Sequence, residues 1–236
     1  KPPLVNWLQA LCIRIWGPNE FAIRLPSALA ALGTCLILLV FSYRTLQNVT
    51  IGCISVLILA STQGFIRHHV SRTGDLDAVL VMWITFYSCI AIHYLLTATK
   101  RHRLYFSLIT FGILMAFLTK SVAGLLPLPG LLMLGILNKR INDIIRVPFL
   151  YFCMVIFLCV YFGFYFLREN ASPGYVDISF QSEYLRFFQN VMPWHEQPVY
   201  FYMTTIYSRF IPYLYIFPFA LYFAFRQENT KPLTKA

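Results

Sequence analysis

Long apolar runs with few charged residues recur along the whole of this 236-residue chain. Runs of about 18 or more such residues have the length that a helix needs to cross the hydrocarbon core of a bilayer. The composition agrees, because 58% of the residues are hydrophobic and only 12% are charged, whereas about a quarter are charged in soluble domains. The sequence therefore predicts an all-α polytopic membrane protein.

The apolar runs divide into about seven predicted spans, which we assign to a single domain over residues 1–236. We expect Pro26 to break the first span, Pro127 and Pro129 to lie within the fifth, and Pro212 to separate the last from a helix at the membrane surface. The predicted ranges are 21–43, 49–66, 76–97, 104–118, 122–137, 148–167 and 198–225.

Basic residues predict the orientation of these spans. Alternate loops at 99–103 and 138–146, together with the tail at 226–236, are short and rich in Lys and Arg. By the positive-inside rule these segments face the cytoplasm. The chain start and the segments between them, including 67–75 and 119–124, are then expected on the outer side.

The outer side nevertheless carries cations that the positive-inside rule does not explain. We interpret them as evidence for an anion at the outer rim, such as a lipid phosphate or diphosphate. The alternative is that each cation binds lipid headgroups or pairs with a nearby acid. The residues concerned are Lys1, Arg14, Arg24, Arg67, Arg72, Lys120, Arg168, Arg186 and Arg209.

The opening stretch KPPLVNWLQALCIRIWGPNE places Lys1 before two prolines, which predict an extended backbone there. Apolar residues then follow helical spacing over 4–16, as in a helix that lies in the membrane interface. Gly17 is expected to end this helix and Asn19 to cap the next. A lead-in helix with a lysine that reaches the headgroups is the alternative.

A second polar cluster lies in RHHVSRTGDLDAVL, residues 67–80. Asp75 is expected to cap the following helix and Asp77 to lie in its first turn, so only one of them should face a site. The carboxylate is a candidate metal ligand, a candidate base, or an ion-pair partner for Arg67 or Arg72.

Two further motifs complete the set of candidates. In LTKSVAGLLPLPG, Lys120 is followed by small residues that allow a ligand or a helix to approach, and its ammonium group can neutralise a phosphate. In PWHEQPVYFY, His195 and Glu196 precede an aromatic helix and are candidate metal ligands. The alternatives are a surface lysine and an aromatic belt at the interface.

The stretches KPPL…RLPSAL, SRTGDLDAVL, LTKSVAGLLPLP and EQPVYFYMTTIYSRFIP, in this order, resemble the bacterial aminoarabinose transferases and the protein O-mannosyltransferase-like enzymes. These are membrane glycosyltransferases of the GT-C superfamily. The resemblance covers nearly the whole chain. It implies a GT-C-type helical bundle in the bacterial inner (plasma) membrane, with its active face on the extracytoplasmic side.

The resemblance also implies the reaction, which is transfer of a sugar from a polyprenyl-phosphate carrier to a lipid A, protein or other glycan acceptor. The expected partners are this donor, the acceptor and membrane lipids, and no nucleic acid. A transporter or flippase of an anionic phosphorylated lipid is the alternative, and a scaffold without catalysis is a third reading. A transporter should show inverted repeats, and we find none in the sequence.

By resemblance, Lys1 and Lys120 contact the donor phosphate, and Arg67 or Arg72 is expected to assist them. Asp77 or Asp75 corresponds to the acid at the start of a later span. His195, with Glu196 beside it, marks the place of a divalent metal, and no other cofactor is implied. The family's usual candidate for the base lies upstream of KPPL. We therefore expect this chain to be the larger part of a membrane core, without turnover by itself.

Overall fold

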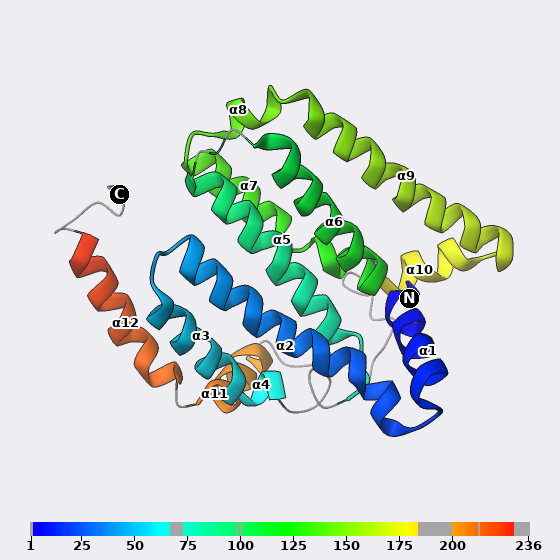
Figure 1. The fold of residues 1–236 in the computed structure, drawn as a ribbon, viewed down its shortest axis with the longest axis horizontal. Coiled ribbons are helices and arrows are strands. Elements are labelled where there is room, and N and C mark those ends of the chain that lie inside the picture. The colour runs from blue at the N-terminus through cyan, green and yellow to red at the C-terminus, as the bar shows by residue number, and fades with distance from the viewer. Residues whose placement is uncertain are drawn as a thin grey trace.

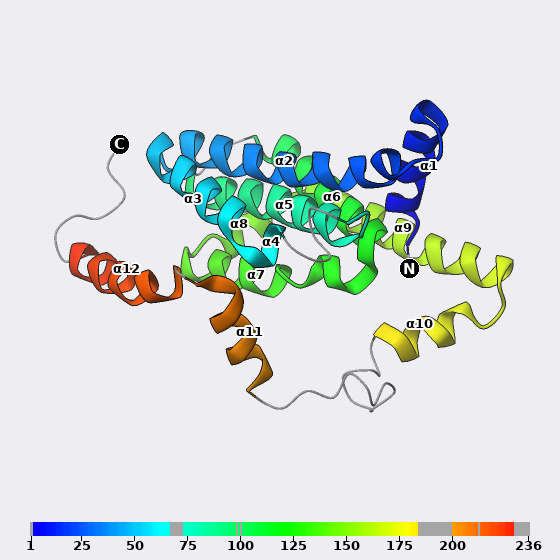
Figure 2. The same ribbon diagram turned by 90° about the horizontal axis from the view of Figure 1, so that it is seen from below.

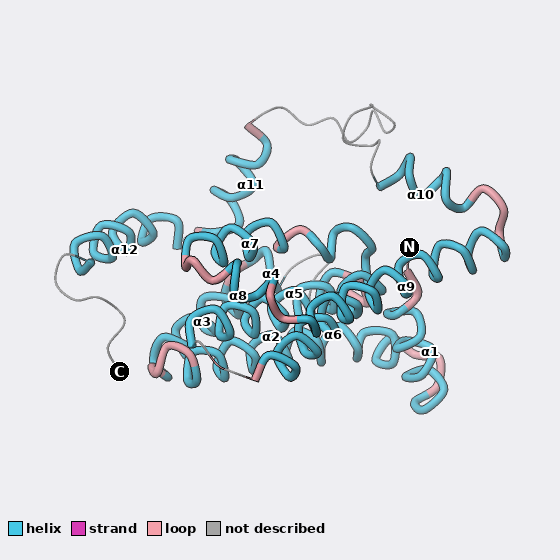
Figure 3. Tube along the Cα trace, turned by 90° about the horizontal axis from the view of Figure 1, so that it is seen from above, coloured by secondary structure: helices cyan, strands magenta, loops and turns pink. Residues whose placement is uncertain are grey.

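The computed structural model describes residues 2–66, 73–97, 99, 101–183, 200–211 and 213–228. Every regular element in this part of the chain is a helix, as the tube drawing in Figure 3 shows. The prediction of an all-α protein is confirmed for these residues. Four helical segments are long and apolar enough to cross a membrane: α2 (Glu20–Arg44), α5 (Asp77–Thr97), α6 (His102–Lys120) continued by η1 (Ser121–Leu125), and α9 (Pro148–Ala171).

The other helices are shorter, and several lie at the ends of the four long ones. Figure 2 shows α11 and α12 set off from the bundle that α2, α5, α6 and α7 form. The bounds of the shorter helices are α1 (Leu4–Trp16), α3 (Val49–Ser61), α4 (Gln63–Ile66), α7 (Leu128–Leu137), α8 (Ile141–Ile145), α10 (Tyr175–Glu183), α11 (Phe201–Phe210) and α12 (Tyr213–Glu228).

The opening of the chain forms the expected helix but not the expected extended elbow. Pro3 has φ −93° and ψ −1°, and its carbonyl accepts the Trp7 amide, so the prediction of an extended backbone was wrong at this residue. Proline is well tolerated at a helix start because its missing N–H would have had no partner there. The predicted cap is confirmed, since the Asn19 side chain accepts a hydrogen bond from the Ala22 amide at 2.8 Å.

Two other breaks differ from the sequence prediction. Helix α2 continues through Pro26, which is buried, so the expected break is absent. The second predicted span instead divides at Thr62, whose amide and hydroxyl both bond to the Ile58 carbonyl while its backbone turns to an extended conformation. A threonine hydroxyl can bond the carbonyl four residues earlier in place of continuing the helix.

The fifth predicted span is also shorter than expected. Residues after Lys120 form a 3₁₀ turn, and α7 begins only at Leu128 and has 10 residues. Pro127 and Pro129 lie at its start, where a proline can begin a helix but cannot continue one from the preceding turn.

Helix α5 is the centre of the bundle and packs between α2 and α6 (Figure 1). Close approach depends on glycine, because a Cβ on Gly112 of α6 would lie 2.7 Å from the Tyr87 Cβ of α5. Buried clusters follow α5 from one end to the other. They comprise Val5, Ala30, Ala78 and Val79; then Leu80, Tyr87 and Ala116; then Tyr94, Phe106 and Cys153.

The bundle has two chemically different ends. We call the site end the one where α2 and α5 begin and α6 and α9 end. The opposite or basic end is held by bonds such as Thr45 Oγ1 to His93 Nδ1 at 2.8 Å and Arg140 Nη1 to the Leu95 carbonyl at 3.3 Å. The described cations there are Arg44, Arg101, Arg103, Lys139, Arg140 and Arg146.

Candidate functional site

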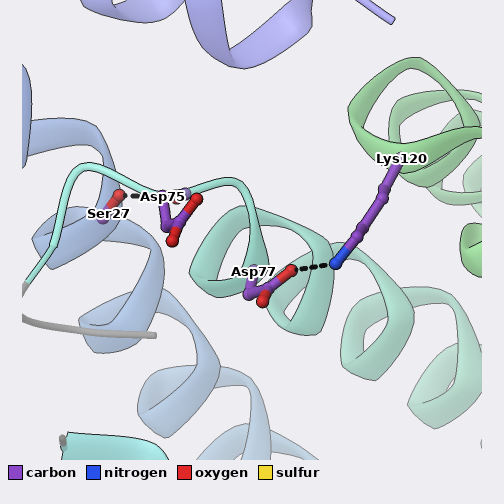
Figure 4. A network of polar contacts seen from close by, with 4 residues as sticks. All are labelled: Ser27, Asp75, Asp77 and Lys120. Atoms are coloured by element: carbon purple, nitrogen blue, oxygen red, sulfur yellow. Dashed lines mark hydrogen bonds and ion pairs between the residues drawn. The ribbon is translucent and has the colours of Figure 1, made fainter. Parts of the chain in front are cut away.

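An ion pair joins two of the predicted site residues at the site end. Lys120 Nζ donates to Asp77 Oδ1 at 2.5 Å, as Figure 4 shows. Lys120 is the last residue of α6 and Asp77 the first of α5, so each charge lies at the helix end whose dipole favours it. The two side chains are 35% and 33% exposed, respectively. The pair is therefore anchored in the bundle yet accessible from outside.

The start of α5 is held in place by side chains from α1 and α2. Ser27 is fully buried, and its Oγ donates to the Asp75 carbonyl at 3.0 Å (Figure 4). Gln9 Nε2 donates to the Gly74 carbonyl at 2.7 Å and lies 3.3 Å from the Ile23 carbonyl. A Cβ on Gly74 would lie 2.7 Å from Ile23 Cγ2. The segment that carries both aspartates is thus fixed against two other helices.

The beginning of α1 lies against the same part of α5. Pro2 and Val5 are fully buried, and Val5 packs in one cluster with Ala78 and Val79, the two residues that follow Asp77. The described part of the KPPL motif and the SRTGDLDAVL motif therefore meet at one end of the bundle. The two motifs are far apart in the sequence, which by itself did not indicate that they would be in contact.

The turn after Lys120 has an unusual backbone. Ser121 has φ +48°, a region that residues other than glycine rarely adopt. Its side chain is buried, and its hydroxyl lies 2.9 Å from the Tyr165 hydroxyl of α9. Strained backbone of this kind persists where surrounding contacts hold it, and it is common at functional sites.

Gly124 explains how that turn fits against α6. A Cβ on Gly124 would lie 2.6 Å from the Ala116 carbonyl carbon, which is backbone that cannot move aside. The Tyr87 hydroxyl of α5 donates to the Gly124 carbonyl at 2.9 Å. The expectation that small residues here allow close backbone approach is confirmed, with a helix as the neighbour.

The two aspartates diverge, as expected. Asp77 lies in the first turn of α5, and its carboxylate reaches Lys120. Asp75 precedes Leu76, whose carbonyl accepts the first helical bond from the Leu80 amide. Figure 4 shows the Asp75 side chain apart from the ion pair. The other predicted site residues, Lys1, Arg67, Arg72, His195 and Glu196, lie outside the described residues.

Besides Lys120, two more of the outer cations have protein partners. Arg24 Nη2 lies 3.0 Å from Glu20 Oε2, and the Arg168 guanidinium lies 4.8 Å from the centre of the Tyr175 ring. For these two residues the structure favours an intramolecular role. Among the described residues, no group of three or more His, Cys, Asp and Glu is placed to hold a metal ion.

Sequence reasoning missed the residues that position the pair. Four polar side chains lie within apolar helices, where a buried polar group needs a hydrogen-bond partner. They are Gln9, Ser27, Tyr87 and Tyr165. The partners are backbone carbonyls and another hydroxyl from distant segments. No local pattern specifies such partners.

Comparison with known proteins gives relatives over almost the whole chain. The undecaprenyl phosphate-alpha-4-amino-4-deoxy-L-arabinose arabinosyl transferase of Shewanella sediminis is 28% identical, over 94% of this chain and 40% of its own length. Proteins with the same function in their names, from Proteus mirabilis and Pseudomonas aeruginosa, are 24% and 25% identical, over 98% and 99% of this chain and 42% of each relative. The chain thus spans about two fifths of the length of these relatives. No solved structure matches it.

A family match covers the larger part of the chain. The family described as dolichyl-phosphate-mannose-protein mannosyltransferase matches residues 1–165, a range that includes α1, the start of α5 and the Lys120 turn. The family and the relatives cited above are named for glycosyl transfer, which gives no support to the transporter reading. The chain is a membrane protein and belongs to the dolichyl-phosphate-mannose-protein mannosyltransferase family of glycosyltransferases.

Proposed function

We propose that the protein containing this chain transfers a sugar from a polyprenyl-phosphate carrier to a lipid, protein or glycan acceptor. The reaction takes place at the extracytoplasmic face of a bacterial inner membrane. The chain supplies part of a GT-C-type, multi-pass bundle, with about seven spans and one domain over residues 1–236. Support comes from the family match, the names of the relatives and the long apolar helices.

The observation that carries the proposal is the Asp77–Lys120 pair at the site end. An ammonium group has three N–H donors, and the contact with Asp77 uses one of them. The remaining donors are available to a phosphate, because the Lys120 side chain is about one third exposed. In this proposal Asp77 positions the ammonium group and Lys120 binds the donor phosphate.

This role fits the chemistry of the leaving group. When the bond between the anomeric carbon and the phosphate oxygen breaks, the electron pair remains on that oxygen. The phosphodiester then becomes a phosphate monoester with one more negative charge. A cation already held at that position stabilises the developing charge, and such preorganised stabilisation is often the largest contribution to catalysis.

The other predicted residues enter the same proposal. Lys1, with Arg67 or Arg72, adds positive charge around the phosphate, and Asp75 is the second carboxylate near the site. His195 and Glu196 are the candidate ligands of a divalent metal. The base that deprotonates the acceptor hydroxyl is expected upstream of Lys1 in the longer protein.

The test is a transfer assay on the full-length protein in proteoliposomes. The donor is a radiolabelled sugar on polyprenyl phosphate, and a nucleotide-linked form of the same sugar is the comparison. We expect labelled product only with the lipid-linked donor and only when an acceptor is present. Movement of labelled donor across the membrane without any acceptor-dependent product would instead support the transporter reading.

A further inference from the structure

The basic end of the bundle contains a hollow that the proposed transfer reaction does not use. It measures about 770 Å³ and lies between the start of α6 and the start of α9. This is within the range of about 300–1,000 Å³ that is common for small-molecule sites. Arg101, His102 and Arg103 line one side of it, and Phe149 and Phe152 line the other.

The charge of this hollow is one-sided. Its described lining includes no acidic residue, and neither Arg101 nor Arg103 forms an ion pair within the described part of the chain. His102 is held by a bond of 2.7 Å between its Nδ1 and the Tyr94 hydroxyl. Asp143 of α8 lies at the same end but does not line this hollow. The hollow therefore presents positive charge without an internal counter-charge.

A second hollow lies on the other side of the α6 start. It measures about 390 Å³ and is lined mostly by apolar side chains of α2, α5 and α6, with Arg44 among them. Leu104 lines both hollows. We call the second hollow the apolar groove. It therefore adjoins the basic hollow at Leu104, at the end of helices long enough to cross a membrane.

We propose that these two hollows together bind an anionic phospholipid. The headgroup phosphate contacts Arg101 and Arg103, and an acyl chain follows the apolar groove past Leu104. Charge complementarity selects an anionic headgroup over a neutral one, because basic residues near the membrane surface attract lipids with a net negative charge. The apolar walls select a lipid over a free phosphate, since only the lipid can remain in the groove. This site is separate from the site end and does not depend on glycosyl transfer.

The test is native mass spectrometry of the full-length protein, titrated in detergent with dioleoyl-phosphatidylglycerol. Dioleoyl-phosphatidylcholine serves as the neutral probe and inorganic phosphate as the competitor. The charge variant is R101Q/R103Q, and R101K/R103K keeps the charge. K139Q removes an exposed cation of the same end that lines neither hollow. L104W fills the groove and leaves the charges in place.

We expect R101Q/R103Q to weaken retention of phosphatidylglycerol by about tenfold or more. K139Q should stay within about threefold of the unmodified protein because Lys139 lines neither hollow, and R101K/R103K should do so because the charge of the hollow is kept. L104W should lose lipid although its charge is unchanged. Three outcomes would each overturn the proposal. The protein would retain the two lipids equally, or R101Q/R103Q and K139Q would lower retention of phosphatidylglycerol to the same extent, or millimolar phosphate would displace the lipid.

Discussion

Lys120 Nζ and Asp77 Oδ1 lie 2.5 Å apart although the two residues are 43 positions apart in the chain. The contact joins the end of α6 to the beginning of α5, and the segments that carry both residues are fixed by partly buried polar contacts. A surface ion pair between free side chains contributes little to stability. Because both partners are held in place here, the main effect of the pair is to position the Lys120 ammonium group.

The ion pair should matter more for activity than for stability. In a double-mutant cycle of D77N and K120Q, we expect a coupling free energy below about 1 kcal/mol in thermal unfolding, because both side chains are partly exposed to solvent. The same cycle measured on transfer rates should show strong non-additivity, since D77N acts through Lys120. Additive effects on the transfer rate would show that Asp77 has a role independent of Lys120.

Gly124 should be intolerant of any side chain. G124A places a Cβ against the α6 backbone, so we expect a loss of about 1–3 kcal/mol in the free energy of unfolding. The matched control is G130A in α7, where a Cβ meets nothing within 4 Å. That variant should be neutral or more stable, because alanine favours helix. Unfolding midpoints in detergent would compare the two, and equal midpoints would contradict the packing described here.

Ser27 should contribute through its bond to Asp75. S27A leaves the Asp75 carbonyl without this donor, and we expect a loss of about 1–2 kcal/mol together with weaker donor binding. S55A in α3 is the control, because Ser55 is partly exposed and its hydroxyl donates to the Ile51 carbonyl of its own helix. If the unfolding midpoint of S27A is no lower than that of S55A, the bond between Ser27 and the Asp75 carbonyl does not hold the start of α5.

Tyr165 should act as a positioning residue for the Lys120 turn. Y165F removes the hydroxyl that meets Ser121, so we expect the transfer rate to fall by about fivefold to tenfold while the helical content stays unchanged. Y151F is the control on the same helix, since Tyr151 is exposed at the opposite end of α9. Equal transfer rates for Y165F and Y151F would show that the Tyr165 hydroxyl does not position the Lys120 turn.

The sequence predicted those parts of the fold that depend on local composition. Helix α5 forms over almost the range that its apolar run indicated, and Asn19 caps α2 as expected. Helix breaks were predicted less well, because α2 passes through Pro26 whereas α3 ends at Ser61, just before Thr62. Packing and side-chain bonding decide such cases, and residue preference alone does not.

The candidate site was predictable as a set of residues but not as an arrangement. Asp77 and Lys120 were both singled out, yet the alternatives for Asp77 were a metal ligand, a base or a partner for Arg67 or Arg72, and none of them was Lys120. Arg67 and Arg72 lie outside the described residues. The choice of Lys120 depends on α5 and α6 packing side by side, with Gly112 at their crossing. That information comes from the tertiary structure.

The most direct test is the single-turnover rate of sugar transfer by the full-length protein at saturating lipid-linked donor. E20Q, which removes an exposed ion pair at the same end, is the control. If Lys120 stabilises the leaving phosphate, K120A should lower this rate by about a hundredfold or more, and K120R should recover part of it. A K120A rate within about twofold of the E20Q rate would contradict the account, because it would leave no such role for Lys120.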